Sequence, residues 1–395
     1  MNISIGSQKF DQLIEENSFY IDKSCFIKAW WESISVTTIL HRPRQFGKTL
    51  NLNMLYCFFS NQYDGKSDLF KNLSIWQESK YRKLQGTYPV IYMSFDGIVP
   101  ENIKEFKSRL KYQIWNLFEQ HRYLLASNLL NNEEKQRFLL YTMDMDDEMY
   151  YISVQELCSF LQRYYGKKVI VLLDSYDIPM METHDNVMKN EMLSIISTFF
   201  HYTFIENQSL ERGLIMGTHK TCSELLFRPS DNVSVISTFS DEFGPYFGFT
   251  MDEVHRLLLE HNCTNQENNL REWYSGFIFG KFREIYNPWS LTNFFNLKVI
   301  LPYWEAPSST ILMLLRAAPS DVINKLSLLL QGNKISINRD SGAVWSLMLD
   351  EGYLMQSPTS ENGNFDIRVT NLEARRILAD IMIKSLIKVK DESKA

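Results

Sequence analysis

The chain has 395 residues, of which 45% are hydrophobic and 22% are charged, and its formal net charge is −6. This composition excludes a disordered or collagen-like chain, and the length predicts two or three domains. The negative net charge argues against a protein whose main activity is electrostatic binding of nucleic acid.

The sequence carries no signal for export or membrane insertion. The N-terminus lacks a basic region followed by an apolar run, and no stretch of 18 apolar residues without charges occurs. The cysteines are scattered without a CxxC pair, which predicts neither a disulfide framework nor a zinc site. We therefore expect a cytoplasmic protein with no membrane contact.

Apolar runs and amphipathic stretches alternate through the first 217 residues. The predicted strands are 35–41, 88–95, 169–173 and 214–217, and the predicted helices are 48–60, 101–125, 154–165 and 186–205. Ser153 followed by Glu156 predicts a capping box at the start of the third helix, and Gly166 predicts its end. Strands separated by helices predict an α/β fold, a parallel sheet with helices on both faces.

From about residue 250 the signals become mainly helical. Predicted helices lie at 250–260, which Thr250 caps, and at 291–295, 309–317 and 343–350; two strands follow at 352–356 and 364–369. Asn371 then caps a last helix from 372 to about 388. The order helix, hairpin, helix is compatible with a winged-helix-like unit. We divide the chain into a P-loop core (1–248), a helical lid region (249–330) and a winged-helix-like C-terminal unit (331–395).

The most informative segment is 42–49, Arg-Pro-Arg-Gln-Phe-Gly-Lys-Thr, which lies between a predicted strand and a predicted helix. A P-loop needs this arrangement, because backbone N–H groups and the helix N-terminus bind phosphate. Lys48 would reach the β- and γ-phosphates, and the Thr49 hydroxyl would bind Mg²⁺. The candidate nucleotide-binding residues are Arg42, which stands at the first glycine of the regular pattern, and Arg44, Gly47, Lys48, Thr49 and Leu50.

The apolar run 169–173 ends in Asp174, the Walker B form whose carboxylate holds Mg²⁺. Many ATPases have a glutamate next that orients the attacking water, but this chain has Ser175, whose hydroxyl is a poor general base. Asp177 either substitutes for it or caps a turn before Pro179. Asp174 and Asp177 are therefore the candidate catalytic residues, and Thr49 and Asp174 are the candidate Mg²⁺ ligands.

Together these motifs resemble the bacterial AAA-ATPase-like family over about residues 5–380. The matching segments are 19–23, 42–52, 173–179, 246–250, 272–277, 286–290 and 302–304, and the Arg-Pro-Arg loop is usual in the family. The resemblance implies an AAA-like ATPase core that binds ATP and Mg²⁺, followed by a helical region. Family members often carry a PD-(D/E)XK nuclease-like domain, but the tail shows no Asp…Glu-x-Lys constellation, so we expect no nuclease activity here.

Three positions depart from the family pattern. The family usually has Asp-Glu-Tyr-Asp at 174–177, an arginine and a lysine near Lys220 and Ser223, and an aspartate at Ser275. These changes predict an ATP-binding protein with weakened or lost hydrolysis that acts as a nucleotide-dependent switch or regulator in a bacterial complex. The residues do not decide whether ATP is hydrolysed.

Two alternatives stay open. The chain is a pseudo-ATPase scaffold, inhibitor or immunity and defence partner that works by protein–protein binding, or it is a nucleic-acid-binding regulator. The second would use Arg368, Arg375 and Arg376 of the C-terminal unit. A protein partner or homo-oligomer is expected in either case, and nucleic acid has the weaker support. His41 and His219 end presumed neighbouring strands and are further candidates near the nucleotide.

Overall fold

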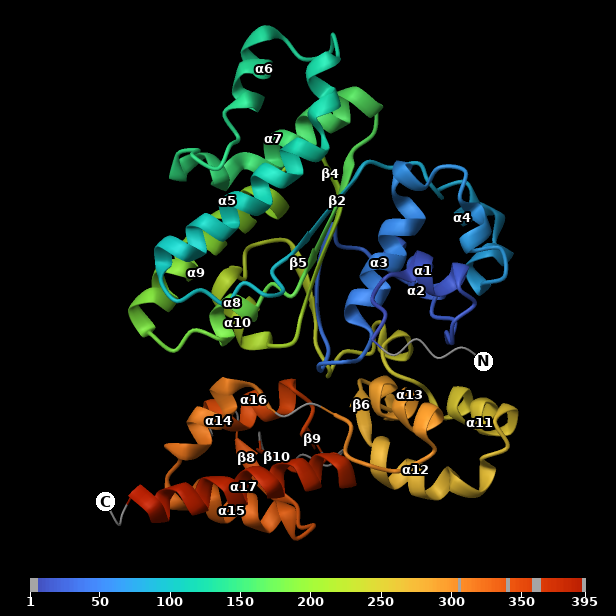
Figure 1. Cartoon of the computed structure of the whole chain (residues 1–395), viewed down its shortest axis with the longest axis vertical. Helices are drawn as coiled ribbons and strands as arrows, with labels where there is room; N and C mark the ends of the chain where they lie inside the picture. The colour runs from blue at the N-terminus through green and yellow to red at the C-terminus, as the bar shows by residue number, and fades with distance from the viewer. Residues whose placement is uncertain (1–5, 305–306, 339–341, 357–363, 393–395) are drawn as a thin grey trace.

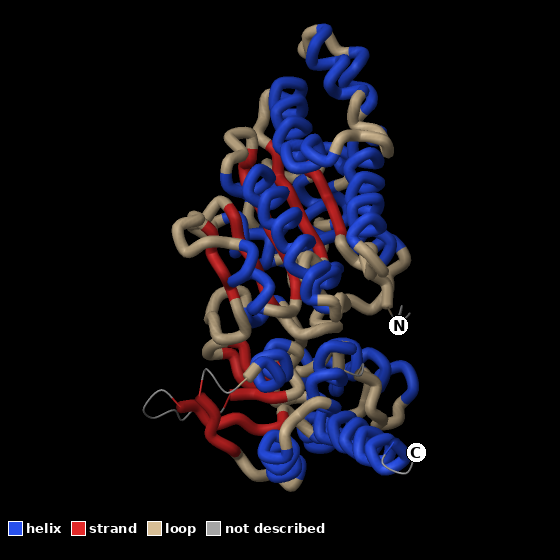
Figure 2. The backbone as a smooth tube through the Cα atoms, turned by 90° about the vertical axis from the view of Figure 1, so that its left-hand side faces the viewer, coloured by secondary structure: helices blue, strands red, loops and turns tan. Residues whose placement is uncertain are grey.

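The computed structural model describes residues 6–304, 307–338, 342–356 and 364–392. An upper part built on a parallel sheet stands above a lower part of helices and small antiparallel sheets (Figures 1 and 2). No helix in these residues has the length and apolar character needed to cross a membrane.

The upper part confirms the predicted α/β fold. Five parallel strands form its sheet in the order β2-β3-β4-β1-β5. They are β1 (Thr37–His41), β2 (Val90–Ser94), β3 (Val169–Asp174), β4 (Leu210–Gly217) and β5 (Val233–Ile236). β1 and β3 are buried along their whole length, as expected for strands covered on both faces. Because the strands are parallel, all their carboxyl ends meet at the lower edge of the sheet (Figure 1).

Helices cover both faces of the sheet (Figure 1). On one side lie α5 (Ile103–Gln120), α7 (Asp147–Tyr165), α8 (Ile178–Met181), α9 (Asn186–Phe200) and α10 (Lys220–Leu226). On the other lie α1 (Phe10–Glu15), α2 (Cys25–Trp31), α3 (Lys48–Phe59) and α4 (Ser79–Arg82). α6 (Asn132–Leu139) projects from the top of the molecule.

The lower part holds the segments predicted as the lid region and the C-terminal unit. In the lid region (249–330) lie α11 (Met251–Glu260), α12 (Glu267–Tyr274), the hairpin β6 (Phe277–Phe279) and β7 (Phe282–Ile285), α13 (Pro288–Leu297), α14 (Ser309–Arg316) and α15 (Ser320–Leu330). In the C-terminal unit (331–395) lie β8 (Ile335–Asn338), α16 (Ala343–Asp350), β9 (Leu354–Gln356), β10 (Asn364–Val369) and α17 (Leu372–Glu392). Its strands form an antiparallel sheet in the order β8-β10-β9, so the predicted hairpin gains a third strand. The predicted turn at 357–363 lies outside the described residues.

Several predicted helix ends are confirmed. Gly166 ends α7 with a φ of 66°, a left-handed conformation that glycine adopts without strain. Thr250 forms a capping box with Glu253 at the start of α11. The Asn371 side chain accepts a hydrogen bond from the N–H of Ala374.

The predicted capping box at Ser153 is wrong. α7 begins earlier, at Asp147, and Ser153 is buried inside it, where its hydroxyl donates to the Tyr150 carbonyl. β4 begins four residues before the predicted strand, because its backbone already pairs with β3 at Leu210, opposite Val169. The Arg212 side chain in this added part donates to the Ser33 and Ser35 carbonyls. β5, β8 and the β6–β7 hairpin were not predicted, since each of their strands has only three or four residues.

A buried carboxylate joins the lid to the last helix. Glu373, in the first turn of α17, accepts hydrogen bonds from the Ser290 hydroxyl and from the N–H groups of Tyr303 and Trp304. Burial raises its pKa to about 7, and these three donors oppose the rise. The two motif segments 286–290 and 302–304 therefore converge on one acidic side chain.

Candidate nucleotide-binding site

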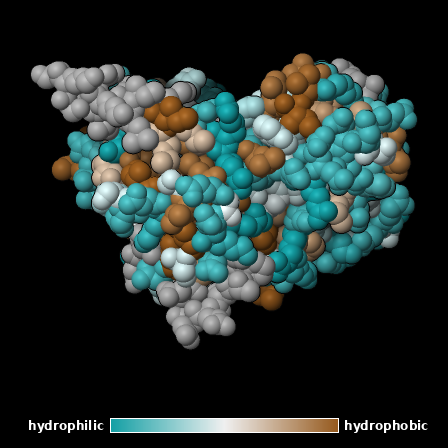
Figure 3. Space-filling view, turned by 90° about the horizontal axis from the view of Figure 1, so that it is seen from below, coloured by the Kyte–Doolittle hydropathy of each residue, from teal (hydrophilic) through white to brown (hydrophobic). Residues whose placement is uncertain are grey.

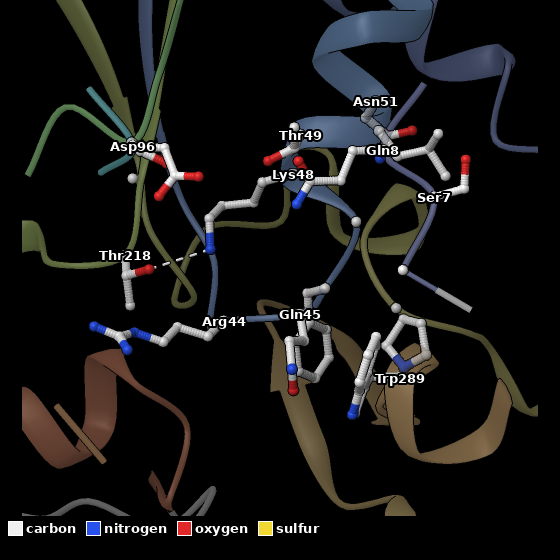
Figure 4. A pocket seen from close by; sticks show the side chains of 18 of the residues that line it. Ser7, Gln8, Arg44, Gln45, Lys48, Thr49, Asn51, Asp96, Thr218 and Trp289 are labelled. Carbon is white, nitrogen blue, oxygen red and sulfur yellow. Dashed lines mark hydrogen bonds between the residues drawn. The ribbon is translucent and has the colours of Figure 1, made fainter. Parts of the chain in front are cut away.

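A cavity of about 710 Å³ lies at the lower edge of the sheet. On its sheet side stand the P-loop, the start of α3 and the residues that follow β2, β3 and β4. On its lid side stand Gly6 to Gln8, Phe19 to Ile21, Tyr246, Phe249, Pro288 and Trp289. Figure 4 shows both sides around one space.

The P-loop turns sharply before α3. Gln45 has a φ of 63° and Gly47 a φ of 79°, both in the left-handed region. A Cβ on Gly47 would meet no other atom within 4 Å, so its backbone conformation alone favours glycine there. α3 then begins at Lys48, and its first residues line the cavity, where a helix N-terminus favours an anion.

Lys48 holds the two ends of this turn together. Its ammonium donates to the carbonyls of Arg42 and Pro43, each at 2.8 Å, and to the Thr218 hydroxyl at 3.1 Å. Burial lowers the pKa of Lys48 to about 8, although the charges of Asp177 and Asp174 oppose that shift.

The two arginines of the loop point in different directions. Arg42 is fully buried; its guanidinium donates to the carbonyls of His41, Ser237 and Glu242. The structure therefore does not bring Arg42 to the cavity with the other predicted nucleotide-binding residues. Arg44 does line the cavity, and its Nη2 lies 3.4 Å from Glu182 Oε1.

Residues of the lower part of the molecule contact the P-loop at three points. Phe46 is buried, and its ring centroid lies 4.6 Å from that of Phe277 in β6. The Trp304 indole donates to the Arg44 carbonyl at 3.3 Å. Gly352 packs so closely on Pro43 that a Cβ there would lie 3.0 Å from the proline ring. The conformation of the P-loop thus depends on the lid and the C-terminal unit.

Asp174 stands at the end of β3, behind Thr49. It is 1% exposed, and its Oδ1 is a buried atom with no hydrogen-bond partner among the described residues. Burial raises the pKa of Asp174, while a hydrogen bond from Thr49 and the charge of Lys48 oppose the rise. An open carboxylate oxygen beside a hydroxyl fits Mg²⁺, which is usually held by one or two protein oxygens and completed by phosphates and water.

No cluster of three or more His, Cys, Asp or Glu residues that could hold a metal occurs among the described residues. A metal at Thr49 and Asp174 would therefore depend on a bound nucleotide for its remaining ligands.

Ser175 and Tyr176 form the bend after β3. Ser175 lines the cavity with a φ of 55°, which is uncommon for a residue other than glycine. The buried Tyr176 hydroxyl donates to the His219 carbonyl at 3.0 Å and lies 2.8 Å from His41 Nε2. Burial lowers the pKa of His41 to about 3, so the ring is neutral. Because the single Tyr176 hydroxyl proton goes to the His219 carbonyl, the proton between the two side chains comes from His41 Nε2. A Cβ on Gly217 would collide with the Tyr176 ring, so this bend requires glycine at the end of β4.

Asp177, His219 and Glu351 form a buried ionic chain that runs from the cavity to the C-terminal unit. His219 Nδ1 lies 2.6 Å from Asp177 Oδ2, and its Nε2 lies 3.0 Å from Glu351 Oε1. Burial alone would lower the pKa of His219, but the hydrogen bonds to two carboxylates outweigh it and raise the pKa to about 9. Both ring nitrogens therefore donate, as an imidazolium requires.

Asp177 holds the backbone of the two residues that directly follow β4. Its Oδ2 also accepts hydrogen bonds from the backbone N–H groups of Thr218 and His219. Burial would raise the pKa of Asp177, but these donors and the His219 charge hold it well below its usual range. Asp177 also stands at the N-cap position of α8, just before Pro179, but its side chain makes no capping hydrogen bond there.

The structure brings most of the predicted site residues to one place. Arg44, Gly47, Lys48, Thr49, Leu50 and Asp177 line the cavity, and Asp174 lies behind Thr49. Sequence reasoning missed Asp96 and Thr218 on the sheet side and Phe249 and Trp289 on the lid side. The first two follow predicted strands and could have been found by the rule that ligands bind beyond the carboxyl ends of parallel strands.

A parallel sheet with a P-loop between β1 and α3 and a buried aspartate at the end of β3 is typical of P-loop nucleotide-binding proteins. The chain belongs to the AAA-ATPase-like family, whose model, described as a predicted AAA-ATPase, matches residues 4–227. Membership of this family implies nucleotide binding.

The chain is also similar to an uncharacterized protein in the vnfD 5′ region of Azotobacter chroococcum mcd 1. The two are 24% identical over 392 residues, which cover 96% of this chain and 70% of that protein.

Proposed function

We propose that this protein binds ATP with Mg²⁺ in the cavity, hydrolyses it slowly and uses it as a conformational switch. The observation that carries the proposal is the P-loop, which presents Lys48, Thr49 and the start of α3 to the cavity beside the open carboxylate oxygen of Asp174. These groups supply cations, N–H donors and metal ligands at one end of the cavity.

The other end of the cavity suits a base and a sugar. Phe19, Phe249 and Trp289 give it aromatic walls, and Gly6 to Gln8 close it from the N-terminal side. A volume of about 710 Å³ lies within the range of ordinary small-molecule sites, roughly 300–1,000 Å³. The triphosphate would lie at the sheet end and the adenosine at the lid end.

A switch needs a connection from the site to a part that responds. The ionic chain through His219 joins Asp177, which lines the cavity, to Glu351, which follows α16. Glu351 also accepts a hydrogen bond from the N–H of Ser308 at the start of α14. Nucleotide that shifts Asp177 or Thr218 would therefore act on the seating of the C-terminal unit.

The test is the melting temperature of the full chain with and without Mg-ATP, in the natural sequence and in Lys48→Ala. A hundredfold excess of ligand over Kd stabilises the native state by about 2.7 kcal/mol, which raises the melting temperature measurably. We expect the rise in the natural sequence and its loss in Lys48→Ala. Equal behaviour of the two proteins would contradict ATP binding at the P-loop.

A protein-binding function without catalysis has one specific observation in its favour. α6 projects from the rest of the fold (Figure 1). On it and in the segments beside it in the chain, four apolar side chains are exposed: Leu129, Leu139, Leu140 and Met143. Exposed apolar side chains that gather in one region mark interaction surfaces. A partner bound at α6 would leave the cavity at the lower edge of the sheet open, so partner binding and ATP binding can occur in the same protein.

A nucleic-acid-binding function has less support. The lower face mixes hydrophilic and hydrophobic side chains (Figure 3). Arg368 uses its guanidinium on the carbonyls of Gly276, Val369 and Thr370. Arg376 forms an ion pair with Asp380 one turn along α17. Arg368 is therefore engaged by carbonyls of the chain itself, whereas Arg376 stays largely exposed in its ion pair.

A further inference from the structure

Asp96 is an acidic residue of the cavity that none of the motifs explains. It lies two residues after Ser94, the last residue of β2. β2 pairs in parallel with β3, and Ser94 lies opposite Asp174. The chain after β2 and the chain after β3 therefore leave the sheet side by side, and Asp96 and Ser175 both line the cavity.

The backbone around Asp96 is fixed from both sides by α5. The Gln113 side chain donates to the Ser94 carbonyl, and the Arg109 guanidinium donates to the Gly97 carbonyl at 2.7 Å. Gly97 has a φ of 73°, which turns the chain away from the sheet just after Asp96. The backbone at Asp96 is thus held at the sheet edge, on the side of the cavity where Figure 4 shows Lys48 and Thr49.

Three carboxylates line this cavity, and two of them already have partners. Asp177 accepts from His219, and Glu182 lies beside Arg44 and accepts from the Ser309 hydroxyl. Among the described residues, the Asp96 side chain has neither a hydrogen bond nor an ion pair. It is exposed to the cavity, and its negative charge adds to the rise in the pKa of Asp174 that burial causes.

We propose that Asp96 is a catalytic residue that supplies, from the neighbouring strand, the carboxylate absent at Ser175. This inference rests on the proposed ATP site. Asp96 accepts a hydrogen bond from a water and aims the lone pair of the water oxygen at the γ-phosphorus.

The step balances without any further reactant. A bond forms between the water oxygen and the γ-phosphorus, and the bond from that phosphorus to the β–γ bridging oxygen breaks. The leaving electron pair stays on the bridging oxygen of ADP. One proton of the water remains on inorganic phosphate, and the other leaves to solvent.

The experiment compares the full chain, Asp96→Asn, Ser175→Glu and the double variant in single-turnover hydrolysis of Mg-ATP. Asp96→Asn keeps the shape of an exposed side chain, so the fold is preserved. We expect its rate to fall about 10²- to 10³-fold while the Mg-ATP-induced rise in melting temperature is unchanged. Ser175→Glu in the Asp96→Asn background should restore the rate. Asp144→Asn, an exposed aspartate far along the chain, is the matched control and should hydrolyse normally.

A second readout does not depend on turnover. Mg-ADP with aluminium fluoride mimics the phosphoryl group in transfer together with the attacking oxygen. The natural sequence should melt at a higher temperature with this mixture than with Mg-ADP alone. Asp96→Asn should lose most of that extra rise, because its neutral amide oxygen accepts a weaker hydrogen bond from the water than the charged carboxylate does.

The outcomes separate the two proposals. If Mg-ATP raises the melting temperature of none of the proteins, the proposed function fails and the role of Asp96 fails with it. If the natural sequence binds ATP without hydrolysing it, the role of Asp96 and the hydrolysis part of the proposed function both fail, while ATP binding stands. If Asp96→Asn keeps both the rate and the extra rise, only the role of Asp96 is overturned.

Discussion

The two ends of the cavity are built in different ways. The sheet end comes from the P-loop and from strand ends that leave one hydrogen-bonded sheet at the same edge. The lid end comes from segments scattered between residues 6 and 292. They are joined by ring contacts such as that of Phe19 with Phe249, by the ion pair of Lys23 with Glu253, and by hydrogen bonds such as that from the Trp289 indole to the Tyr303 carbonyl at 2.9 Å.

This difference supports the proposed placement of the triphosphate at the sheet end and of the base at the lid end. Groups fixed by a sheet and by buried ion pairs lose little freedom when they meet charge, so they suit phosphate, metal and catalysis. Aromatic walls contributed by separate segments bind a flat base and adjust to it. Substitutions at the sheet end should therefore change stability and chemistry, and substitutions at the lid end should change affinity.

The largest effect is expected at the ionic chain that ties the sheet end to the C-terminal unit. His219→Gln leaves two buried carboxylates, Asp177 and Glu351, without a cation between them, and breaking a buried pair costs about 3–5 kcal/mol. Urea unfolding at neutral pH measures the loss. His255→Gln removes an exposed histidine that pairs with Glu267 and should cost less than about 1 kcal/mol. Equal losses in the two variants would show that the buried ion pairs of His219 stabilise the fold no more than an exposed ion pair does.

The same ion pairs of His219 predict that the stability of the fold depends on pH. The pKa of His219 is raised to about 9 in the folded protein, so its stabilisation is complete below its ordinary pKa of 6.5 and is lost as the pH rises through 9. The difference in the free energy of unfolding between the natural sequence and His219→Gln should therefore shrink between neutral pH and about pH 10. Asp177, Glu351, Asp350 and His41 also interact with this ring, so the comparison with the variant isolates its share. A constant difference would mean that His219 is neutral in the fold.

A moderate effect is expected at the lid end. Trp289→Ala removes an aromatic wall, and stacking of a base on an aromatic side chain contributes about 1–3 kcal/mol. Affinity for Mg-ATP should fall about tenfold, while the hydrolysis rate of bound ATP stays the same. Trp289→Phe keeps a ring and should recover most of the affinity, which calorimetric titration can measure. A loss of rate without a loss of affinity would reverse the assignment of the two ends.

The smallest effect is expected at Ser175. Its φ of 55° strains a serine but not a glycine, so Ser175→Gly should stabilise the fold by about 0.5–1 kcal/mol. Thermal unfolding without nucleotide measures this change. A loss of stability would mean that the serine hydroxyl has a bond that outweighs the strain.

The sheet end could be predicted because its signals are local. A strand, a turn with Gly47 and a helix that begins at Lys48 stand next to one another in the sequence, and Asp174 ends an apolar run. The direction of Arg42 could not be predicted, because its carbonyl partners Ser237 and Glu242 lie about 200 residues away in the loop after β5. Asp96 belongs to no motif; the strand-end rule could have placed it at the cavity, but its position beside Ser175 depends on the pairing of β2 with β3. The residues of the lid end were noticed only because they lie in segments that match the family, such as 19–23 and 286–290; the sequence did not predict that they line a cavity.

The contact of Phe277 with Phe46 bears on the order in which a ribosome delivers this protein. The nascent chain contains the whole P-loop by Thr49, but the ring that packs on Phe46 arrives with Phe277, and the acceptor for Tyr303 and Trp304 arrives only with Glu373. At translation rates of about 5–20 residues per second, roughly 12 to 46 s separate Phe46 from Phe277. A half-made chain therefore has the P-loop motif without the contacts that hold it in the folded protein.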